Sequence, residues 1–272
     1  MGIINLNDDS FSGDGTLQVE EALGLARRMV ADGADIVDVG GESARTNRAA
    51  ITPGEEVRRV EPFVREFLAA RHGWMPRDET QVWPPVLSVN TWRPEVVRPL
   101  LEAGAELCND MGALPTDENA RIAADCGAAL LLMHSVGEPK VPHTATMWDD
   151  VVGEQMAFFR ARMDLAAGAG LPHEAIILDP GLDFAKQRDD NLRLLRETDK
   201  IAALGRPVLM PVSRKTVIGD VLGLPDPRTR DAGTWACIVA GIRRGVSIFR
   251  VHAVREAASV IRVVWATRQA NR

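Results

Sequence analysis

Residues 86–110 read VLSVNTWRPEVVRPLLEAGAELCND and contain one complete copy of the pattern that decides the fold. The apolar run Val86–Thr91 predicts a buried strand, and Pro94–Ala103 has the apolar periodicity of an amphipathic helix. A Gly-Ala pair follows, which is typical punctuation after a helix, and Glu106–Asp110 then predicts a second strand. The segment therefore predicts a β-α-β unit, in which a helix joins two parallel strands.

The same unit recurs along the chain. The other predicted strands are Gly2–Leu6, Asp35–Gly41, Ala129–His134, Ala175–Asp179, Pro207–Ser213 and Ser247–His252. The other predicted helices are Val19–Asp32, Gly54–Arg71, Glu118–Cys126, Trp148–Ala169, Asn191–Ala203, Thr234–Arg244 and Val254–Thr267. Eight strands alternating with eight helices favour an α/β fold, a parallel (β/α)8 TIM barrel that spans residues 1–272 as a single domain. A doubly wound open sheet is the alternative, but no GxGxxG motif follows the first strand.

The composition is that of a soluble globular protein, with 46% hydrophobic and 26% charged residues. A net charge of -6 argues against a nucleic-acid-binding surface. No apolar run approaches the roughly 18 residues that span a bilayer, and the first residues lack the regions of a signal peptide. We therefore expect a cytoplasmic protein that acts on small molecules, with neither a nucleic acid nor a membrane as partner.

Polar residues gather where the predicted strands end, which is where the active site of a (β/α)8 barrel lies. A single polar residue there is commonly a turn or a helix cap, whereas convergence of eight strand ends favours a ligand site. In chain order these residues are Asn5, Glu42 with Arg45, Asn90, Asn109 with Asp110, His134, Asp179, Ser213 with Arg214 and Lys215, and Arg250 with His252.

The charges divide this predicted site into two halves. Cationic side chains follow the last two strands, where barrels of this class commonly bind phosphate. Asn5 follows the neighbouring first strand, and its amide oxygen suits Mg²⁺ carried on a phosphate. Amides and one carboxylate in the other half suit a flat heterocycle with several N–H donors. The cationic half contains Lys215, Arg250 and His252, and the other half contains Asn90, Asn109 and Asp179.

Several chemistries lack their motifs. No HExxH or His-rich ligand spacing predicts a catalytic zinc, and no GxSxG motif or Cys-His pair predicts a nucleophile. Cys108 and Cys237 lie in apolar runs and are expected to be inert core residues, and for Arg214 we expect a surface ion pair. What remains is metal-assisted departure of a phosphate or diphosphate from a ligand held by amides and a carboxylate.

Three motifs are specific in combination: IILDPGLDFAK at 176–186, PVSRKTVIG at 211–219 and FRVHAVRE at 249–256. With them, the chain resembles the dihydropteroate synthases, the pterin-binding barrels of folate synthesis, over essentially its whole length. The resemblance implies that the protein joins 7,8-dihydropterin-6-methyl diphosphate to p-aminobenzoate and releases diphosphate. It also implies a homodimer formed through the late helices, and competition by sulfonamides as p-aminobenzoate mimics.

The resemblance further implies a role for each site residue. Catalytic roles fall to Asp179, Lys215 and Asn90. The pterin would be bound by Asn90, Asn109, Met133, Asp179 and Lys215, with Met133 packed beneath the ring. The diphosphate would be bound by Asn5, Arg250 and His252, with Asn5 as the ligand of Mg²⁺. The p-aminobenzoate pocket would be lined by Arg45 and Phe184.

Some positions depart from the family. Asn90 stands where the family has an aspartate that can offset cationic charge, and Pro211 and Asp183 replace usual glycines. At an effective dielectric near 20 and about 4 Å, one charge interaction is roughly 4 kcal/mol, and a third of that is about tenfold in rate. Two interpretations remain: a divergent synthase, or a pterin-binding paralogue that has lost or altered the reaction. The first is favoured because Asn109, Asp179 and Lys215 are retained.

Overall fold

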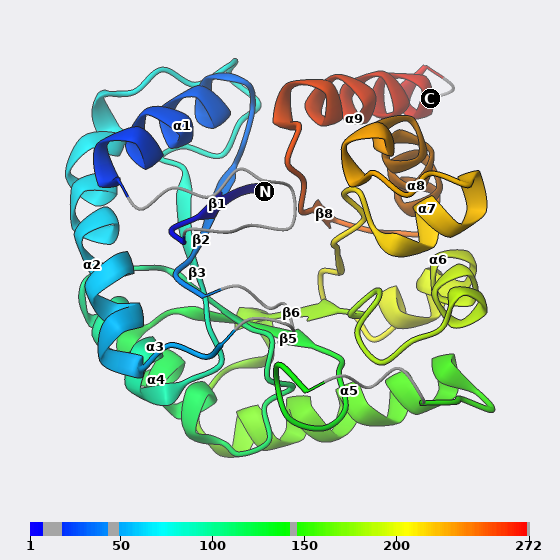
Figure 1. The fold of residues 1–272 in the computed structure, drawn as a ribbon, viewed down its shortest axis with the longest axis horizontal. Helices are drawn as coiled ribbons and strands as arrows, with labels where there is room; N and C mark the ends of the chain where they lie inside the picture. Colours follow the sequence, from blue (N-terminus) through cyan, green and yellow to red (C-terminus); the bar gives the residue numbers. More distant parts are fainter. Residues whose placement is uncertain (8–17, 43–48, 142–145, 271–272) are drawn as a thin grey trace.

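Parallel strands at the centre of the molecule are surrounded by helices (Figure 1). The structure is a computed structural model that describes residues 1–7, 18–42, 49–141 and 146–270. The strands are β1 (Gly2–Asn5), β2 (Ile36–Gly40), β3 (Val86–Asn90), β4 (Leu107–Asp110), β5 (Ala129–Met133), β6 (Ile176–Asp179), β7 (Leu209–Met210) and β8 (Ile248–Phe249). Strands β1 to β6 pair in sequence order, and β7 pairs with β8, all in parallel.

Two isolated bridges close the barrel. Leu178 of β6 pairs with Val208 next to β7, and Gly2 of β1 pairs with Val251 two residues beyond β8. The Val251 backbone N–H also donates to the Met1 carbonyl at 3.0 Å. The predicted (β/α)8 barrel is therefore confirmed, and its last strand returns to lie beside its first.

The helices lie outside the barrel and follow the strands in turn. They are α1 (Val19–Ala31), α2 (Pro53–Ala70), α3 (Pro94–Glu102), α4 (Glu118–Cys126), α5 (Val151–Gly168), α6 (Arg188–Ala202), α7 (Thr216–Leu222), α8 (Asp231–Arg243) and α9 (Val254–Gln269). Helix α7 is absent from the sequence prediction because its 7 residues are too few to display an apolar periodicity. Within the part of the chain that the structure describes, no helix is both long enough and apolar enough to cross a membrane.

Strands β7 and β8 are shorter than the sequence predicts. Each contains 2 residues, whereas the apolar runs Pro207–Ser213 and Ser247–His252 predict longer strands. Pro211 follows β7 directly and has no backbone N–H to donate to a neighbouring strand. The chain beyond β7 is therefore free to turn into the loop that carries Ser213 and Lys215.

Side chains along each strand alternate between two buried layers, because successive residues of a strand point to opposite faces. In β2, Val37 and Val39 pack with the helices around the barrel, in the same cluster as Phe63 of α2. Ile36 packs instead in the cluster that fills the barrel interior. Asp38 lies between Val37 and Val39 and therefore faces inward. The same alternation turns a set of polar side chains toward the interior: Asn5, Asp38, Ser88, Asn90, Asn109 and Asp179.

Candidate active site

Strand pairing brings the predicted ligand residues together at the C-terminal ends of the strands. Asn90 of β3 lies directly opposite Asn109 of β4, and Met133 of β5 lies opposite Asp179 of β6. Asn90 Nδ2 donates to the Asn109 carbonyl at 3.4 Å. Asn109, Met133 and Asp179 are buried, and Asn90 is half-buried. Two amides, a thioether and a carboxylate thus line one side of the barrel mouth.

Asp179 carries a buried carboxylate and is the last residue of β6, just before the chain turns into a loop. Its Oδ1 accepts a hydrogen bond from the Gly181 backbone N–H at 2.7 Å. Burial raises the pKa of Asp179 to about 6, against the opposing effects of that hydrogen bond and of the cations Lys215, Arg250 and Lys186. The loop requires glycine at 181, because φ is +62° and a Cβ atom would lie 2.1 Å from the His134 carbonyl oxygen.

Lys215 joins the heterocycle half of the site to an aromatic side chain. Its ammonium lies 4.9 Å from the centre of the Phe184 ring and donates to the Leu182 carbonyl at 2.8 Å. Burial lowers the pKa of Lys215. The Leu182 carbonyl is its one acceptor among the described residues, so two N–H groups of the ammonium remain for a ligand. The structure therefore brings together Lys215, predicted as a pterin ligand, and Phe184, predicted to line the p-aminobenzoate pocket.

Arg250 and His252 follow β8 and present nitrogen donors on the other side of the mouth. Arg250 Nε donates to Asp38 Oδ2 at 2.8 Å. The His252 backbone N–H donates to Ser213 Oγ at 3.2 Å, and this hydroxyl lies 2.8 Å from His252 Nδ1. Which of Ser213 Oγ and His252 Nδ1 donates in this contact depends on the tautomer of the imidazole. In either tautomer the two contacts with Ser213 hold the His252 ring at the mouth.

Asn5 completes this half from β1, with its side chain facing the barrel interior at half burial. Arg45, predicted to line the p-aminobenzoate pocket, lies outside the described residues. In the described ranges, no three His, Cys, Asp or Glu side chains gather in a way that could hold a metal ion. An amide oxygen with the oxygens of a bound phosphate is a donor set that Mg²⁺ accepts, because this ion retains several waters.

Two interior residues were missed by the sequence analysis. Asp38 accepts hydrogen bonds from Ser88 Oγ, Asn109 Nδ2 and Arg250 Nε. Lys186, which is buried, donates to the carbonyls of His134 at 3.1 Å and Phe184 at 2.8 Å. Two features of the sequence could have identified them. Asp38 is a charged residue in the middle of a predicted strand, and Lys186 ends the DPGLDFAK motif.

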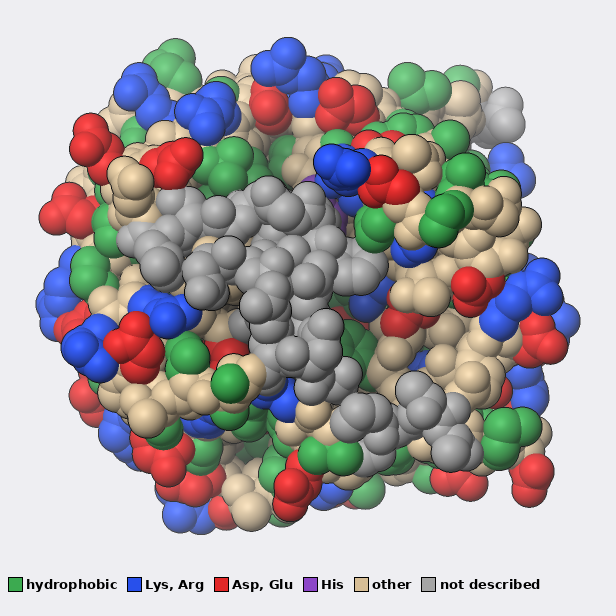
Figure 2. Space-filling model, in the orientation of Figure 1, with side chains coloured by type: hydrophobic (Ala, Val, Ile, Leu, Met, Phe, Trp, Pro, Cys, Tyr) green, Lys and Arg blue, Asp and Glu red, His purple; other side chains and the backbone are tan. Residues whose placement is uncertain are grey.

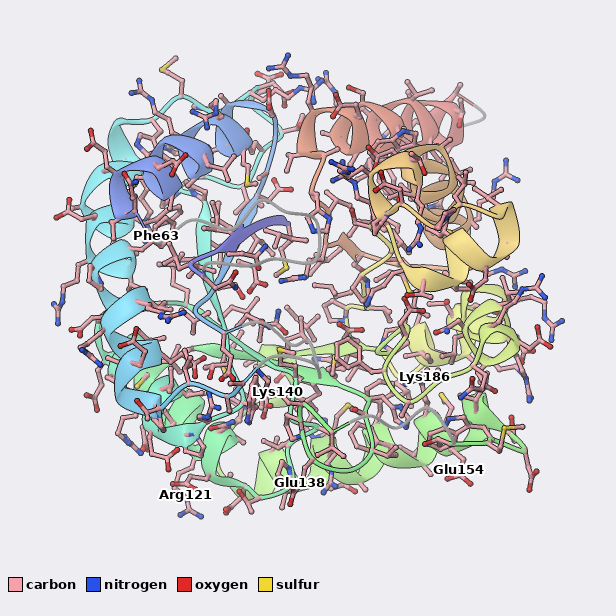
Figure 3. The ribbon with its side chains drawn as sticks, in the orientation of Figure 1. Phe63, Arg121, Glu138, Lys140, Glu154 and Lys186 are labelled. Carbon is pink, nitrogen blue, oxygen red and sulfur yellow. The ribbon has the colours of Figure 1, made fainter. Side chains whose placement is uncertain are left out.

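The position of Lys186 explains its electrostatics. Burial lowers the pKa of Lys186 to about 7, although the neighbouring Asp179 favours the charged form. Its two carbonyl contacts join the loop after β5 to the loop after β6, and Figure 3 shows it inside the ring of helices. Lys186 therefore ties the loop that follows Asp179 to the loop after β5.

Other polar strand ends do not face a ligand. His134 is buried, its Nδ1 has no partner in the described part of the chain, and its ring contacts Trp148 and Phe158 at 5.3 and 4.8 Å. Burial lowers the pKa of His134 to about 3, so the ring is neutral. Arg214 forms the expected ion pair, its Nε donating to Asp231 at 2.8 Å.

Glu42 lies at the end of β2 and is tied into a cluster of four charged side chains. It accepts from Arg93 and, at 2.8 Å, from Lys140 Nζ. Arg93 also donates to Glu56 of α2 at 2.5 Å. This charge cluster, Glu42, Glu56, Arg93 and Lys140, connects the loops after β2, β3 and β5.

Cys108 lies in the core, as expected, whereas Cys237 is half-buried and packs against the core. Cys108 is buried, and burial raises the pKa of its thiol well above the usual value. Burial also raises the pKa of Cys237 to about 11. Both thiols are therefore protonated at neutral pH. A nucleophilic cysteine would have to be a thiolate, so neither fits that role.

Asp183, one of the departures from the family, occupies a left-handed backbone conformation with φ at +67°. Its carboxylate accepts from the Thr216 backbone N–H at 2.6 Å and from Asn191 Nδ2 at 3.2 Å. Aspartate is one of the few residues that tolerate this conformation, and here it also satisfies the first turn of α7. The glycine of the family is thus replaced by a residue that ties the Asp179 loop to the Lys215 loop.

Comparison with known proteins agrees with this geometry. A family model described as pterin binding enzyme matches residues 1–252. A dihydropteroate synthase from Synechocystis is 38% identical over 265 residues, covering 97% of this chain and 88% of that protein. Dihydropteroate synthase from Yersinia pestis, solved with a sulfonamide drug, superimposes with a TM-score of 0.88 at 34% identity, covering 99% of this chain and 93% of that one. The Xanthomonas albilineans synthase, solved with 7,8-dihydropteroate, gives a TM-score of 0.83 at 35% identity, covering 99% and 93%.

A parallel barrel with amides, a carboxylate and cations at its mouth thus defines this chain as a member of the pterin-binding enzyme family. Within that family the chain belongs to the dihydropteroate synthases, which are transferases of folate biosynthesis.

Proposed function

We propose that this chain catalyses the magnesium-dependent condensation of 7,8-dihydropterin-6-methyl diphosphate with p-aminobenzoate, releasing diphosphate. The observation that carries the proposal is the meeting, at one barrel mouth, of heterocycle-binding groups and anion-binding groups contributed by different strands. The similarity to synthases along nearly the whole chain supports it.

The pterin lies against the amide and carboxylate half. Ionised Asp179 accepts from the guanidine-like N–H edge of the ring, and such charge-assisted hydrogen bonds are the stronger kind. Asn109 and Asn90 bind further ring atoms, while Lys215 donates its remaining N–H groups to an acceptor of the ring. Met133 packs beneath the ring from β5, where it is buried beside Leu131.

The diphosphate lies against Arg250, His252 and Asn5. Mg²⁺ would be carried by the diphosphate, with the amide oxygen of Asn5 as a protein ligand. Bound Mg²⁺ supplies positive charge that stabilises the departing diphosphate. Arg250 and His252 add fixed N–H donors to the same oxygens, and these are organised before the reaction begins.

The bond-making step requires little proton chemistry. The bond between the methylene carbon and the diphosphate oxygen breaks, and its electron pair leaves with the diphosphate. Positive charge then resides on the methylene and the pterin ring, near the carboxylate of Asp179. The neutral amine of p-aminobenzoate attacks that carbon and afterwards loses a proton, so no strong base is required. Phe184 holds the aromatic ring of p-aminobenzoate, and the contribution of Arg45 to this pocket stays a prediction because Arg45 lies outside the described residues.

We expect the protein in the cytoplasm, as a homodimer that pairs through α9, where Val263 and Trp265 are 65% and 54% exposed. Lys, Arg, Asp and Glu side chains are interspersed on the face shown in Figure 2, and this mixture offers no continuous basic surface there for nucleic acid. Sedimentation of wild type and Trp265→Glu would test the dimer, since a monomeric wild type contradicts it.

A pterin-binding paralogue that has lost or altered the reaction is the alternative function, and Asn90 is the observation that favours it. The deciding experiment measures diphosphate release from the pterin diphosphate in Mg²⁺, with and without p-aminobenzoate. Release that depends on p-aminobenzoate and yields dihydropteroate establishes the synthase. Calorimetric binding of the pterin diphosphate without release establishes the paralogue instead.

A further inference from the structure

The carboxylate of Asp38 lies inside the barrel and accepts three hydrogen bonds. Its side chain is fully buried. Oδ1 accepts from Ser88 Oγ at 2.6 Å, and Oδ2 accepts from Asn109 Nδ2 at 3.1 Å and from Arg250 Nε at 2.8 Å. These donors belong to β3, to β4 and to the residue after β8. One carboxylate therefore connects the pterin half of the site to the diphosphate half.

The contact with Asn109 determines which way round its amide lies. An ionised carboxylate only accepts hydrogen bonds, so Nδ2 of Asn109 must be the atom that faces Asp38. Oδ1 is then on the other side of the amide and is an acceptor. A residue that can present either a donor or an acceptor to a ring is thereby fixed as an acceptor.

The contact with Arg250 has a comparable effect. It uses Nε, and among the described residues Asp38 is the one acceptor of this guanidinium. Both terminal NH₂ groups remain for a ligand, and 23% of the side chain is exposed. Because the guanidinium is planar, a fixed Nε also fixes the direction of these groups. An oxyanion then meets an oriented pair of donors, and less side-chain entropy is lost on binding.

We propose that Asp38 is a positioning residue for the transfer reaction. It holds Asn109 as an acceptor for the pterin and holds Arg250 in the orientation that receives the diphosphate. Asp38 itself contacts neither the pterin nor the diphosphate. The proposal rests on the functions proposed above for Asn109 and Arg250. Since one carboxylate holds both residues, its loss weakens the binding of both halves of the substrate.

Double-mutant cycles on the full chain test this inference. The probes are 6-hydroxymethyl-7,8-dihydropterin for one half and inorganic diphosphate with Mg²⁺ for the other, each titrated by calorimetry. Asp38→Asn keeps the shape and removes the charge, and we expect it to weaken each affinity by about tenfold. In an Asn109→Ala background Asp38→Asn should no longer change pterin affinity, and in an Arg250→Ala background it should no longer change diphosphate affinity.

Several results would overturn the inference. Unchanged affinities in Asp38→Asn, or losses that simply add to those of Asn109→Ala and Arg250→Ala, mean that Asp38 does not act through these residues. If Asn109→Ala and Arg250→Ala themselves leave both affinities unchanged, the proposed function of the site fails instead. Ser88→Ala removes the Oδ1 contact alone, so we expect it to lower stability with affinities changed by less than about twofold. An equal loss of affinity in Ser88→Ala identifies a packing defect and overturns the proposal.

An exchange of the two side chains covers the case in which Asp38→Asn does not fold. In Asp38→Asn combined with Asn109→Asp, the donor and the acceptor trade places, and an acceptor still remains for the pterin. We expect this pair to regain folding and most of the pterin affinity that Asp38→Asn alone loses. Failure to regain either would contradict the proposal.

Discussion

Asn90 and Asn109 lie directly opposite each other on β3 and β4, and Asn90 Nδ2 donates to the Asn109 carbonyl at 3.4 Å. The asparagine at position 90 thus forms a long hydrogen bond to the neighbouring strand, which a carboxylate could not donate. The family's aspartate would exchange this contact for a negative charge beside the pterin, where positive charge develops as the diphosphate leaves.

We therefore expect Asn90→Asp to raise turnover by about tenfold, because a carboxylate offsets the positive charge that develops on the pterin. Loss of the hydrogen bond to Asn109 should lower the free energy of unfolding by about 1 kcal/mol. Steady-state kinetics and urea denaturation measure the two effects. Asn90→Ala, which gains no charge, is the control and should not be faster. Equal or lower turnover in Asn90→Asp would show that the asparagine is no defect.

Pterin affinity should fall as the pH falls through about 6, the pKa of Asp179. Protonated Asp179 is no longer a charged acceptor for the pterin N–H edge. Stability should move the other way: the pKa of Asp179 is raised above the usual aspartate value of 3.8, so the folded state gains stability from this group as the pH falls toward 4. Lys186, with a pKa of about 7, stays charged as the pH falls from 6 toward 4.

Calorimetry with 6-hydroxymethyl-7,8-dihydropterin between pH 5 and 8 measures this dependence without the ionisation of a diphosphate. Asp179→Asn is the matched control, because it should bind more weakly but with little dependence on pH. Asp179→Ala should abolish binding and retain the fold. A wild-type affinity that stays constant through pH 6 would count against Asp179 as the pterin ligand.

The charge cluster predicts how the stability of the fold changes when Lys140, in the loop after β5, is replaced. Figure 3 places Lys140 nearer the centre of the view than Arg121, and Lys140 and Glu42 are 10% and 3% exposed in their ion pair. Removing one partner of a buried pair commonly costs 3–5 kcal/mol, but Arg93 still neutralises Glu42 here. We therefore expect Lys140→Met to lower the free energy of unfolding by about 2 kcal/mol.

Adding Glu42→Gln to Lys140→Met restores the charge balance, since Arg93 then pairs with Glu56 alone. We expect the double variant to lose about 1 kcal/mol less free energy of unfolding than the two single variants lose together. Denaturation in urea measures all four proteins of the cycle. Strict additivity would mean that the four side chains do not act as one cluster.

Asp183 predicts an order of stability among its replacements. Asp183→Gly loses the hydrogen bonds to Thr216 and Asn191 but fits the left-handed backbone without strain. Asp183→Ala loses the same bonds and retains the strain, so it should be less stable than the glycine variant by about 1 kcal/mol. Thermal and chemical denaturation compare the two. An alanine variant as stable as the glycine variant would contradict the left-handed geometry.

Sulfonamides should compete with p-aminobenzoate in the pocket beside Phe184. The ring lies against the Lys215 ammonium, so Phe184→Ala should raise the KM for p-aminobenzoate by about tenfold and weaken sulfonamide inhibition in parallel. Phe184→Leu keeps apolar bulk and should be affected less. Inhibition kinetics at saturating pterin diphosphate and Mg²⁺ provide the measurement, and the absence of competition there would contradict the pocket.

The barrel could be predicted from the sequence, and so could many of the polar residues that gather at its mouth. Strand and helix periodicities are local properties, so β1 to β6 and eight of the helices could be predicted from short windows. Asp179 and Lys215 could be identified because each follows a strand, at the end where this fold places its ligands. Helix α7 was too short to produce such a signal, and Pro211 shortened β7 in a way that the apolar run concealed.

The way in which these residues act together depends on contacts between distant parts of the chain. The Asp38 carboxylate meets Arg250 across 212 positions of sequence, and Glu42 meets Lys140 across 98. Such contacts depend on strand register and on closure of the barrel, which no local pattern specifies. His134 and Glu42 show the converse, because a strand end places a side chain near the mouth while burial and neighbouring charges decide whether it faces a ligand. Local propensity sets the elements, and packing sets the environment that gives each polar side chain its function.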